Sequence, residues 1–200
     1  MNKNLKICIL AAAALFAVYA AVDLYIYAQC GRYALHADNS ANMLVARNIY
    51  WGDGAQTSVL WALANNGMGV EDITRTEDYW PVYWPAMVSV TYHVFGPGVF
   101  GATMLTMLFK LVIFSLVFAW VYRITHSPAH ALAAFAAAQC LGFMTTSPGL
   151  SDIPMCAFAF SSLSLLALPT RGPGKAACLA AGVLMGVALG VKQSAILSLG

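Results

Sequence analysis

The sequence predicts an all-α, polytopic membrane protein with about five transmembrane helices and a structured first outer loop that contains short interfacial helices. Three observations carry this prediction. The mean hydropathy is +0.72. Only 9% of the 200 residues are charged, and the apolar residues form several long runs. A chain of this composition is typical of proteins whose hydrophobic solvent is the bilayer, and not of soluble domains.

The first apolar run, residues 7–28, is expected to be a signal anchor. It is longer than the apolar core of a secretory signal peptide and lacks a clean small-residue cleavage site. Lys3 and Lys6 precede the run and no lysine lies within it, which predicts a cytoplasmic N-terminus by the positive-inside rule. The expected location is the plasma (inner) membrane, with several passes.

The next segment, residues 30–84, is predicted to be an outer loop because it holds six of the eight carboxylates. Residues 43–49 and 59–64 are nevertheless apolar enough for short helices at the interface. Pro81 and Pro85 favour extended geometry at the residues before them. Trp80, Tyr83 and Trp84 are residue types that suit headgroup depth.

The rest of the chain alternates apolar runs with short polar turns. Residues 86–95 are too few to cross a bilayer and precede Gly96-Pro97-Gly98, so a re-entrant or surface helix is expected there. Four further spans are expected at about 99–122, 129–146, 153–168 and 176–199. Basic residues after the first and third of these indicate cytoplasmic turns, which places Asp38, Asp152 and Lys192 together on the outer side.

Several charged residues lie inside or beside these apolar runs. Lys192 interrupts the last run, and a charge inside a membrane is costly and usually partnered, which indicates a site. Lys110 lies within the 99–122 span and is a second candidate, whereas Asp23 is close enough to the outer end of its span to be interfacial. Three glycines at four-residue spacing in the last run favour close helix packing; they are Gly182, Gly186 and Gly190.

Composition also bounds the partners and cofactors. A net charge of +2 without a cluster of basic residues argues against a nucleic-acid partner. Four of the five cysteines lie in apolar segments and no CxxC pair occurs, so neither a disulfide framework nor a zinc site is indicated. No cofactor is expected, and although carboxylates can hold a divalent ion, no ligand set is visible.

The order of several short motifs resembles the GT-C membrane glycosyltransferases, in particular the protein mannosyltransferase and aminoarabinose transferase type. That family has an acidic residue leading a helix that ends in an A-R-N-x-x-x-G-x-G-like run, then a P-x-x-Y-P-like approach to a segment closing with F-G. An acidic residue opening a later span and a G-x-x-x-G-x-A-x-x-x-K segment follow. Here these places are taken by Asp38, Ala46-Arg47-Asn48, Gly52, Gly54, Pro81, Tyr83, Pro85, Phe95-Gly96, Asp152, Gly182, Gly186, Ala188 and Lys192.

The resemblance implies an enzyme that moves a sugar, with inversion, from a polyprenyl-phosphate donor in the membrane to an acceptor at the outer face. Asp38 would be the base that takes the acceptor's proton, and Asp152 the second acidic residue of the site. Arg47 and Lys192 are the candidates for contacting phosphate, and Tyr83 for contacting substrate. Other readings stay open: either aspartate as a helix cap, and Arg47 as a residue that snorkels to headgroups.

The chain also departs from the family pattern. Many relatives carry two adjacent acids where this sequence has Asp38-Asn39, and relatives are considerably longer, so we expect the chain to be the N-terminal part of such an enzyme. Two other functions remain open. One is a transporter or channel subunit in which Asp23, Lys110 and Lys192 line a polar path. The other is a non-catalytic membrane fragment.

Overall fold

The computed structural model describes residues 3–30, 37–57, 75–76, 82–143, 151–169 and 172–192. Its regular structure is helical apart from one two-residue antiparallel pair, β1 (Gln56–Thr57) with β2 (Arg75–Thr76). The all-α prediction is confirmed for this part of the chain. The expected helix at residues 59–64 lies outside the described residues. The helices are α1 (Lys3–Cys30), α2 (Ala37–Trp51), α4 (Tyr83–Phe95), α5 (Val99–Thr125), α6 (Pro128–Phe143), α7 (Asp152–Ala167) and α8 (Lys175–Val191).

Two of the described helices, α1 and α5, are long and apolar enough to cross a membrane. Their mean hydropathies are 2.3 over Lys3–Ile26 and 2.2 over Val99–Thr125. Helices α6, α7 and α8 are also apolar but have only 16, 16 and 17 residues. At a rise of ~1.5 Å per residue they fall somewhat short of the ~30 Å hydrocarbon core. Length and composition therefore establish two helices able to span.

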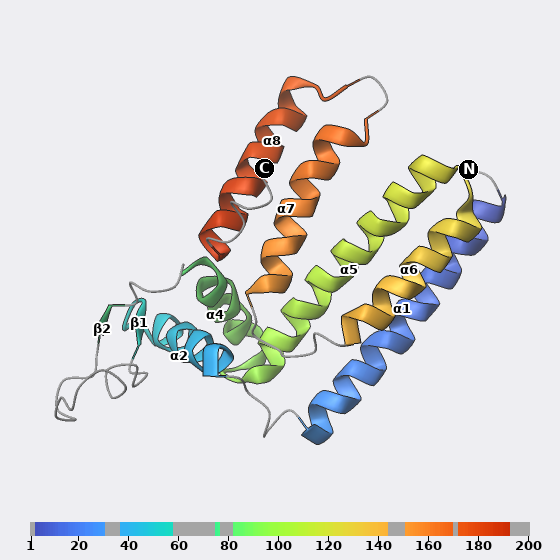
Figure 1. Cartoon of the computed structure of the whole chain (residues 1–200). Helices are drawn as coiled ribbons and strands as arrows, with labels where there is room; N and C mark the ends of the chain where they lie inside the picture. The colour runs from blue at the N-terminus through green and yellow to red at the C-terminus, as the bar shows by residue number, and fades with distance from the viewer. Residues whose placement is uncertain are drawn as a thin grey trace.

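The helices form a row with two short helices across one end. In Figure 1, α1, α6 and α5 lie side by side, and α7 and α8 continue the row. Helices α2 and α4 pack on each other, and α4 also contacts α5 and α8. The end of the row that carries α2 and α4 (the α2–α4 end) also holds the N-termini of α5 and α7 and the C-terminus of α8.

The turn between α5 and α6 lies at the opposite end and is closed by local polar contacts. His126 adopts the left-handed conformation that ends α5, with φ of 52°. The Ser127 hydroxyl accepts a hydrogen bond of 3.4 Å from the backbone N–H of His130. Pro128 follows as the first residue of α6, a position where its missing N–H is not needed. A serine cap followed by proline thus turns the chain back sharply.

Helix α4 begins earlier than the sequence suggested and ends at Phe95, where Gly96 with φ of 75° stops it. Trp84 is helical although it directly precedes Pro85, so the extended geometry expected there is wrong. Proline is tolerated in a first turn because its nitrogen needs no acceptor. Trp84 is also fully buried, so its expected place among lipid headgroups is wrong as well.

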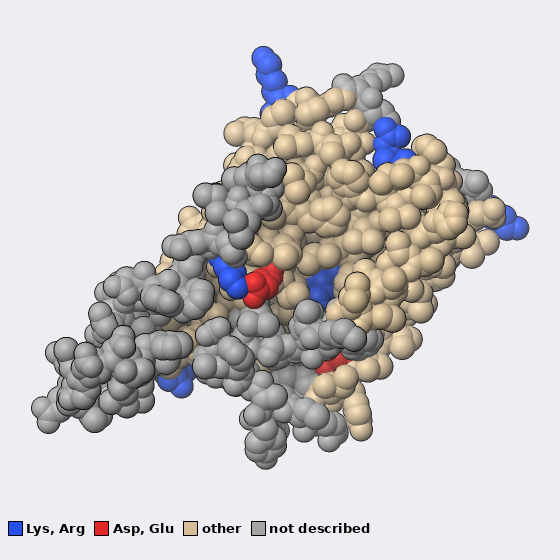
Figure 2. All heavy atoms as spheres, in the orientation of Figure 1, with Lys and Arg blue, Asp and Glu red and all other residues tan. Residues whose placement is uncertain are grey.

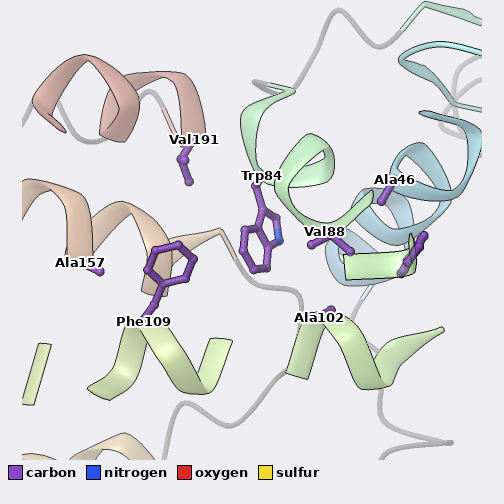
Figure 3. Packing of buried hydrophobic residues seen from close by; sticks show 8 residues of the cluster. Ala46, Trp84, Val88, Ala102, Phe109, Ala157 and Val191 are labelled. Atoms are coloured by element: carbon purple, nitrogen blue, oxygen red, sulfur yellow. The ribbon is translucent and has the colours of Figure 1, made fainter. Parts of the chain in front are cut away.

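Trp84 lies at the centre of a hydrophobic cluster that holds the α2–α4 end together. Figure 3 shows its ring between Phe109 of α5 and Val88 of α4, and the Trp84 and Phe109 ring centroids are 6.2 Å apart. We call this cluster the Trp84 core. It consists of Ala46 of α2, Trp84, Val88 and Tyr92 of α4, Ala102 and Phe109 of α5, Ala157 of α7 and Val191 of α8.

A second cluster, the Tyr19 core, joins α1 to α5 and α6. Its buried members are Ala12 and Tyr19 of α1, Met107 and Phe114 of α5, and Phe135 of α6. The Tyr19 and Phe114 rings meet edge to face with centroids 5.5 Å apart, an arrangement that aromatic pairs favour. Aromatic packing thus holds α1 within the bundle.

Charges are distributed unevenly along the row. Lys3 and Lys6 at the start of α1, Arg123 at the end of α5 and Lys175 at the start of α8 are all exposed. Figure 2 shows basic side chains projecting from the upper and right-hand edges of a largely uncharged face. We call this the basic end, and it lies opposite the α2–α4 end.

Candidate functional site

Asp152 is the first residue of α7, directly after Ser151. The Ser151 side chain makes no capping hydrogen bond, and the Asp152 carboxylate is directed to another helix. The first turn of a helix favours negative charge because its backbone N–H groups point outward there. Asp152 is therefore held at the positive end of the α7 dipole, and a plain capping role does not describe its side chain.

Lys192 follows the last helical residue of α8. Its backbone N–H still bonds to the Ala188 carbonyl oxygen at 3.0 Å, and its own backbone is extended. A cation at this position is favoured by the negative end of the α8 dipole. Because α7 and α8 pack as antiparallel neighbours, the start of one lies beside the end of the other.

The two side chains form an ion pair at the α2–α4 end. Lys192 Nζ donates to Asp152 Oδ1 at 2.6 Å. The side chains keep 25% and 45% of their surface exposed, respectively, so the pair is accessible. An ammonium group has three donors, and one is used here. Two of the five residues predicted for the site are thus brought together.

Tyr83 of α4 packs on α8, the helix that Lys192 follows. Its ring packs so closely on the backbone of Gly190 that a Cβ added at Gly190 would overlap the ring carbons. Gly190 is two residues before Lys192, and 49% of Tyr83 remains exposed. Glycine is required at this position because only a bare backbone leaves room for the ring. The first residue of α4 therefore lies against the last turn of α8, two residues before Lys192.

Arg47 lies elsewhere on the same end of the molecule. It is exposed on α2, and its guanidinium carbon lies 4.9 Å from the centre of the Trp51 ring on its own helix. Its neighbour Ala46 is in the Trp84 core, as is Val191 beside Lys192. The described contact of Arg47 is a cation–π pair, and it does not join the Asp152–Lys192 pair.

Tyr92 connects α2 to α4. Its hydroxyl donates to the Met43 carbonyl oxygen at 3.4 Å. Burial raises the pKa of the Tyr92 phenol to about 12, while the nearby positive charge of Arg47 opposes the shift. The phenol therefore stays protonated at physiological pH and remains a donor. This contact fixes α2 on α4, and with it the helix that carries Asp38.

Asp38 belongs to the first turn of α2 as the structure describes it, but its side chain lies outside the described residues. The helix ends at Trp51, followed by Gly52 and Gly54 with φ of 90° and 81°. Positive φ favours glycine, which accounts for both glycines of the motif. The candidate base therefore lies in the first turn of the helix that packs on α4.

A second ion pair, between Asp23 of α1 and Lys110 of α5, lies within the bundle. Lys110 Nζ donates to Asp23 Oδ2 at 3.1 Å, and the side chains are 3% and 9% exposed for Lys110 and Asp23, respectively. Lys110 Nζ also lies 5.4 Å from the centre of the Tyr19 ring. The interpretation of Asp23 as merely interfacial is wrong. The available signal was that two opposite charges lay inside apolar runs, and such charges are usually paired.

Comparison with known proteins adds no further assignment: no family model, curated protein or solved structure matches the chain. Within the described residues, no three histidine, cysteine or acidic side chains gather as a metal site. The class defined by fold and site is therefore a helical protein with two membrane-length helices and an accessible acid–lysine pair at one end.

Proposed function

We propose that the chain is a multi-pass plasma-membrane glycosyltransferase of the GT-C type, which transfers a sugar from a polyprenyl-phosphate donor to an acceptor at the outer face. The single observation that carries the proposal is the accessible Asp152–Lys192 ion pair at the α2–α4 end. In this proposal α1, α5, α6, α7 and α8 are the five spans, and the basic end faces the cytoplasm in accord with the positive-inside rule.

Lys192 is the residue proposed to hold the donor phosphate. Among the described residues its ammonium group donates one hydrogen bond of a possible three, to Asp152, and its side chain is partly exposed. Charge-assisted hydrogen bonds to phosphate strengthen as the sugar bond breaks and negative charge collects on the leaving group. Asp152 positions the lysine. The exposed Tyr83 ring against the last turn of α8 supplies a surface for the donor.

The reaction itself needs a proton acceptor. The acceptor's oxygen or nitrogen attacks the anomeric carbon, and the bond from that carbon to the phosphate oxygen breaks. The polyprenyl phosphate leaves with the bonding electrons, and the acceptor's proton passes to a carboxylate. Asp38 on α2 is proposed as this base, because a carboxylate within reach of the acceptor can remove its proton during attack. Arg47 on the same helix is proposed as a second phosphate contact.

The proposal is tested by sugar transfer in membranes that contain the full-length gene product, with a radiolabelled polyprenyl-phosphate sugar as the probe. We expect Lys192→Gln to lower transfer at least about tenfold, and Asp38→Asn to lower it by ~100-fold or more, the usual contribution of a general base. Lys175→Gln, which removes a cation at the basic end, is the matched control and should leave transfer unchanged. Undiminished transfer by Lys192→Gln contradicts the phosphate assignment, and undiminished transfer by Asp38→Asn contradicts the base.

A transporter or channel subunit is the second candidate, because the Asp23–Lys110 pair is buried between two membrane-length helices. Buried charge inside a bundle often marks an ion path. Gln139 of α6 is buried as well, and its Nε2 has no hydrogen-bond partner among the described residues. This candidate predicts proton flux in proteoliposomes under an imposed pH gradient. The flux should be lost in Lys110→Met, and equal leakage with and without the chain excludes this function.

A further inference from the structure

A groove opens between the halves of α1 and α5 that lie nearer the basic end. Its volume is about 390 Å³, and its lining is almost wholly apolar. Ser115 of α5 is the polar residue of the lining. The other contributors include Ile9 and Phe16 of α1, Leu111 and Phe118 of α5, and Phe135 of α6.

In the proposed topology the groove lies at bilayer depth, because α1 and α5 are both long and apolar enough to cross a membrane. The lining residues of α1 recur every three or four positions, from Ile9 to Phe16, so they occupy one helix face. Lys6 precedes Ile9 by three residues and lies on that same face, one turn nearer the basic end. It is exposed.

The charge around this end of the groove is entirely positive. Arg123 of α5 follows Phe118 by five residues, which is about 7 Å along the helix and roughly 140° around its axis. It is exposed at this end of α5 but lies off the helix face that lines the groove. Neither α5 nor α6 contains an acidic residue, and the acid of α1 is Asp23, which is paired with Lys110. An anion near Lys6 therefore meets cations and no carboxylate from the three helices that line the groove.

We infer that this groove binds an anionic glycerophospholipid of the cytoplasmic leaflet, with one acyl chain between α1 and α5 and the headgroup phosphate at Lys6. Basic pockets between transmembrane helices on the cytoplasmic side are suited to acidic headgroups. The apolar lining accepts a hydrocarbon chain, and Lys6, one turn beyond it on the same face of α1, lies where the phosphate of that lipid would be. The inference rests on the proposed membrane insertion of α1 and α5, and sugar transfer plays no part in it.

The test is native mass spectrometry of the purified chain with dioleoylphosphatidylglycerol and dioleoylphosphatidylcholine, which share acyl chains but differ in charge. We expect preferential retention of phosphatidylglycerol. Lys6→Gln should weaken its binding about fivefold, the usual effect of one cation at a membrane surface. Ser115→Trp, which fills the groove, should weaken binding of both lipids at least about tenfold, since a bulky ring leaves no room for the chain.

Two matched controls separate this site from general effects. Lys175→Gln removes a cation from the same end but from α8, and Leu10→Trp adds a ring to an exposed face of α1; both should bind phosphatidylglycerol normally. Equal binding of the two lipids overturns the inference. A loss of phosphatidylglycerol binding in the two control variants as large as in Lys6→Gln and Ser115→Trp overturns it as well. Displacement of phosphatidylglycerol by undecaprenyl phosphate also overturns it, because the groove would then hold the sugar carrier's chain. The readout is lipid binding, so its failure is distinct from a failure of sugar transfer.

Discussion

At the scale of single residues, the two ion pairs differ in how far they are removed from solvent. The Asp23–Lys110 pair is almost completely buried, while the Asp152–Lys192 pair keeps a quarter to a half of its side-chain surface exposed. Exposed pairs contribute about 0–1 kcal/mol to stability. Removing one partner of a buried pair strongly destabilises the fold, because it leaves an uncompensated buried charge. The first pair is therefore expected to matter more for stability than the second, and the exposure of the second leaves it open to the ligand proposed above.

The buried pair gives a prediction about stability. Lys110→Met or Asp23→Asn alone should destabilise the fold by about 3–5 kcal/mol, because each leaves an uncompensated buried charge. The double variant should recover most of that loss, since both charges are then gone. Unfolding of the detergent-purified chain in a denaturant series measures this. Additive losses in the double variant would contradict coupling between the two residues.

The accessible pair gives the opposite prediction. Asp152→Asn should change the free energy of unfolding by less than about 1 kcal/mol, because an exposed ion pair adds little. The same variant should lower sugar transfer, since it releases the lysine that is proposed to hold the phosphate. Unfolding and transfer measured on one preparation separate the two effects. A large loss of stability would indicate that the pair is structural.

At the scale of elements, the short helix α4 connects the site to the core. Trp84 is buried between α5 and α8, while Tyr83, one residue earlier, is half exposed and covers Gly190. Successive residues of a helix point in different directions, so one helix end supplies both a core anchor and a candidate substrate contact. Gly190 matters because its missing side chain leaves space for the Tyr83 ring, and not because of an unusual backbone conformation.

Two glycines of α8, Gly186 and Gly190, provide a matched test of the contact between Tyr83 and Gly190. Gly190→Ala should destabilise the fold by about 1–3 kcal/mol, as overpacking does, because the new methyl overlaps the Tyr83 ring. Gly186→Ala should be neutral or slightly stabilising, because nothing lies within 4 Å of a Cβ there and alanine favours helix. Thermal unfolding of both variants makes the comparison. Equal effects would show that Tyr83 does not rest on α8.

At the scale of the whole molecule, the separation of charge between the two ends is the feature that the proposed topology depends on. The basic end carries the exposed cations Lys3, Lys6, Arg123 and Lys175. The α2–α4 end carries both signs of charge among its described residues, with Arg47 and Lys192 as cations and Asp53 and Asp152 as anions. Asp152 lies at the other end with α2 and α4. Cytoplasmic ends of membrane helices carry an excess of lysine and arginine. The α2–α4 end would therefore face outward.

Cysteine labelling checks this orientation. In a background without the native cysteines, Asp53→Cys after α2 should react with a membrane-impermeant maleimide added to intact cells. Lys175→Cys at the start of α8 should react only after permeabilisation. Both positions are exposed in the structure, so the protein itself would not hinder the reagent. The reverse pattern would place the candidate site in the cytoplasm and contradict the proposed topology.

The sequence by itself predicted the helical class and the clustering of basic residues. Of the five spans that it predicted, two correspond to described helices long enough to cross a membrane, α1 and α5. These predictions depend on composition and on order along the chain, which are local properties. It also singled out Asp152, Lys192 and Lys110 as charges in apolar surroundings. Its errors concerned Asp23 and Trp84, which were assigned to the interface. In both cases a distant helix covers the residue, and hydropathy along one segment does not record that cover.

Only the tertiary structure decided which residues meet. Lys192 pairs with Asp152, 40 positions away, and Lys110 with Asp23, 87 positions away. Which lysine meets which aspartate depends on how the two helices that carry them are rotated and offset against each other. That rotation is set by the packing of the Trp84 and Tyr19 cores, in which members of distant segments share one volume. Opposite charges in the sequence indicate that a partner is needed, and close packing selects it.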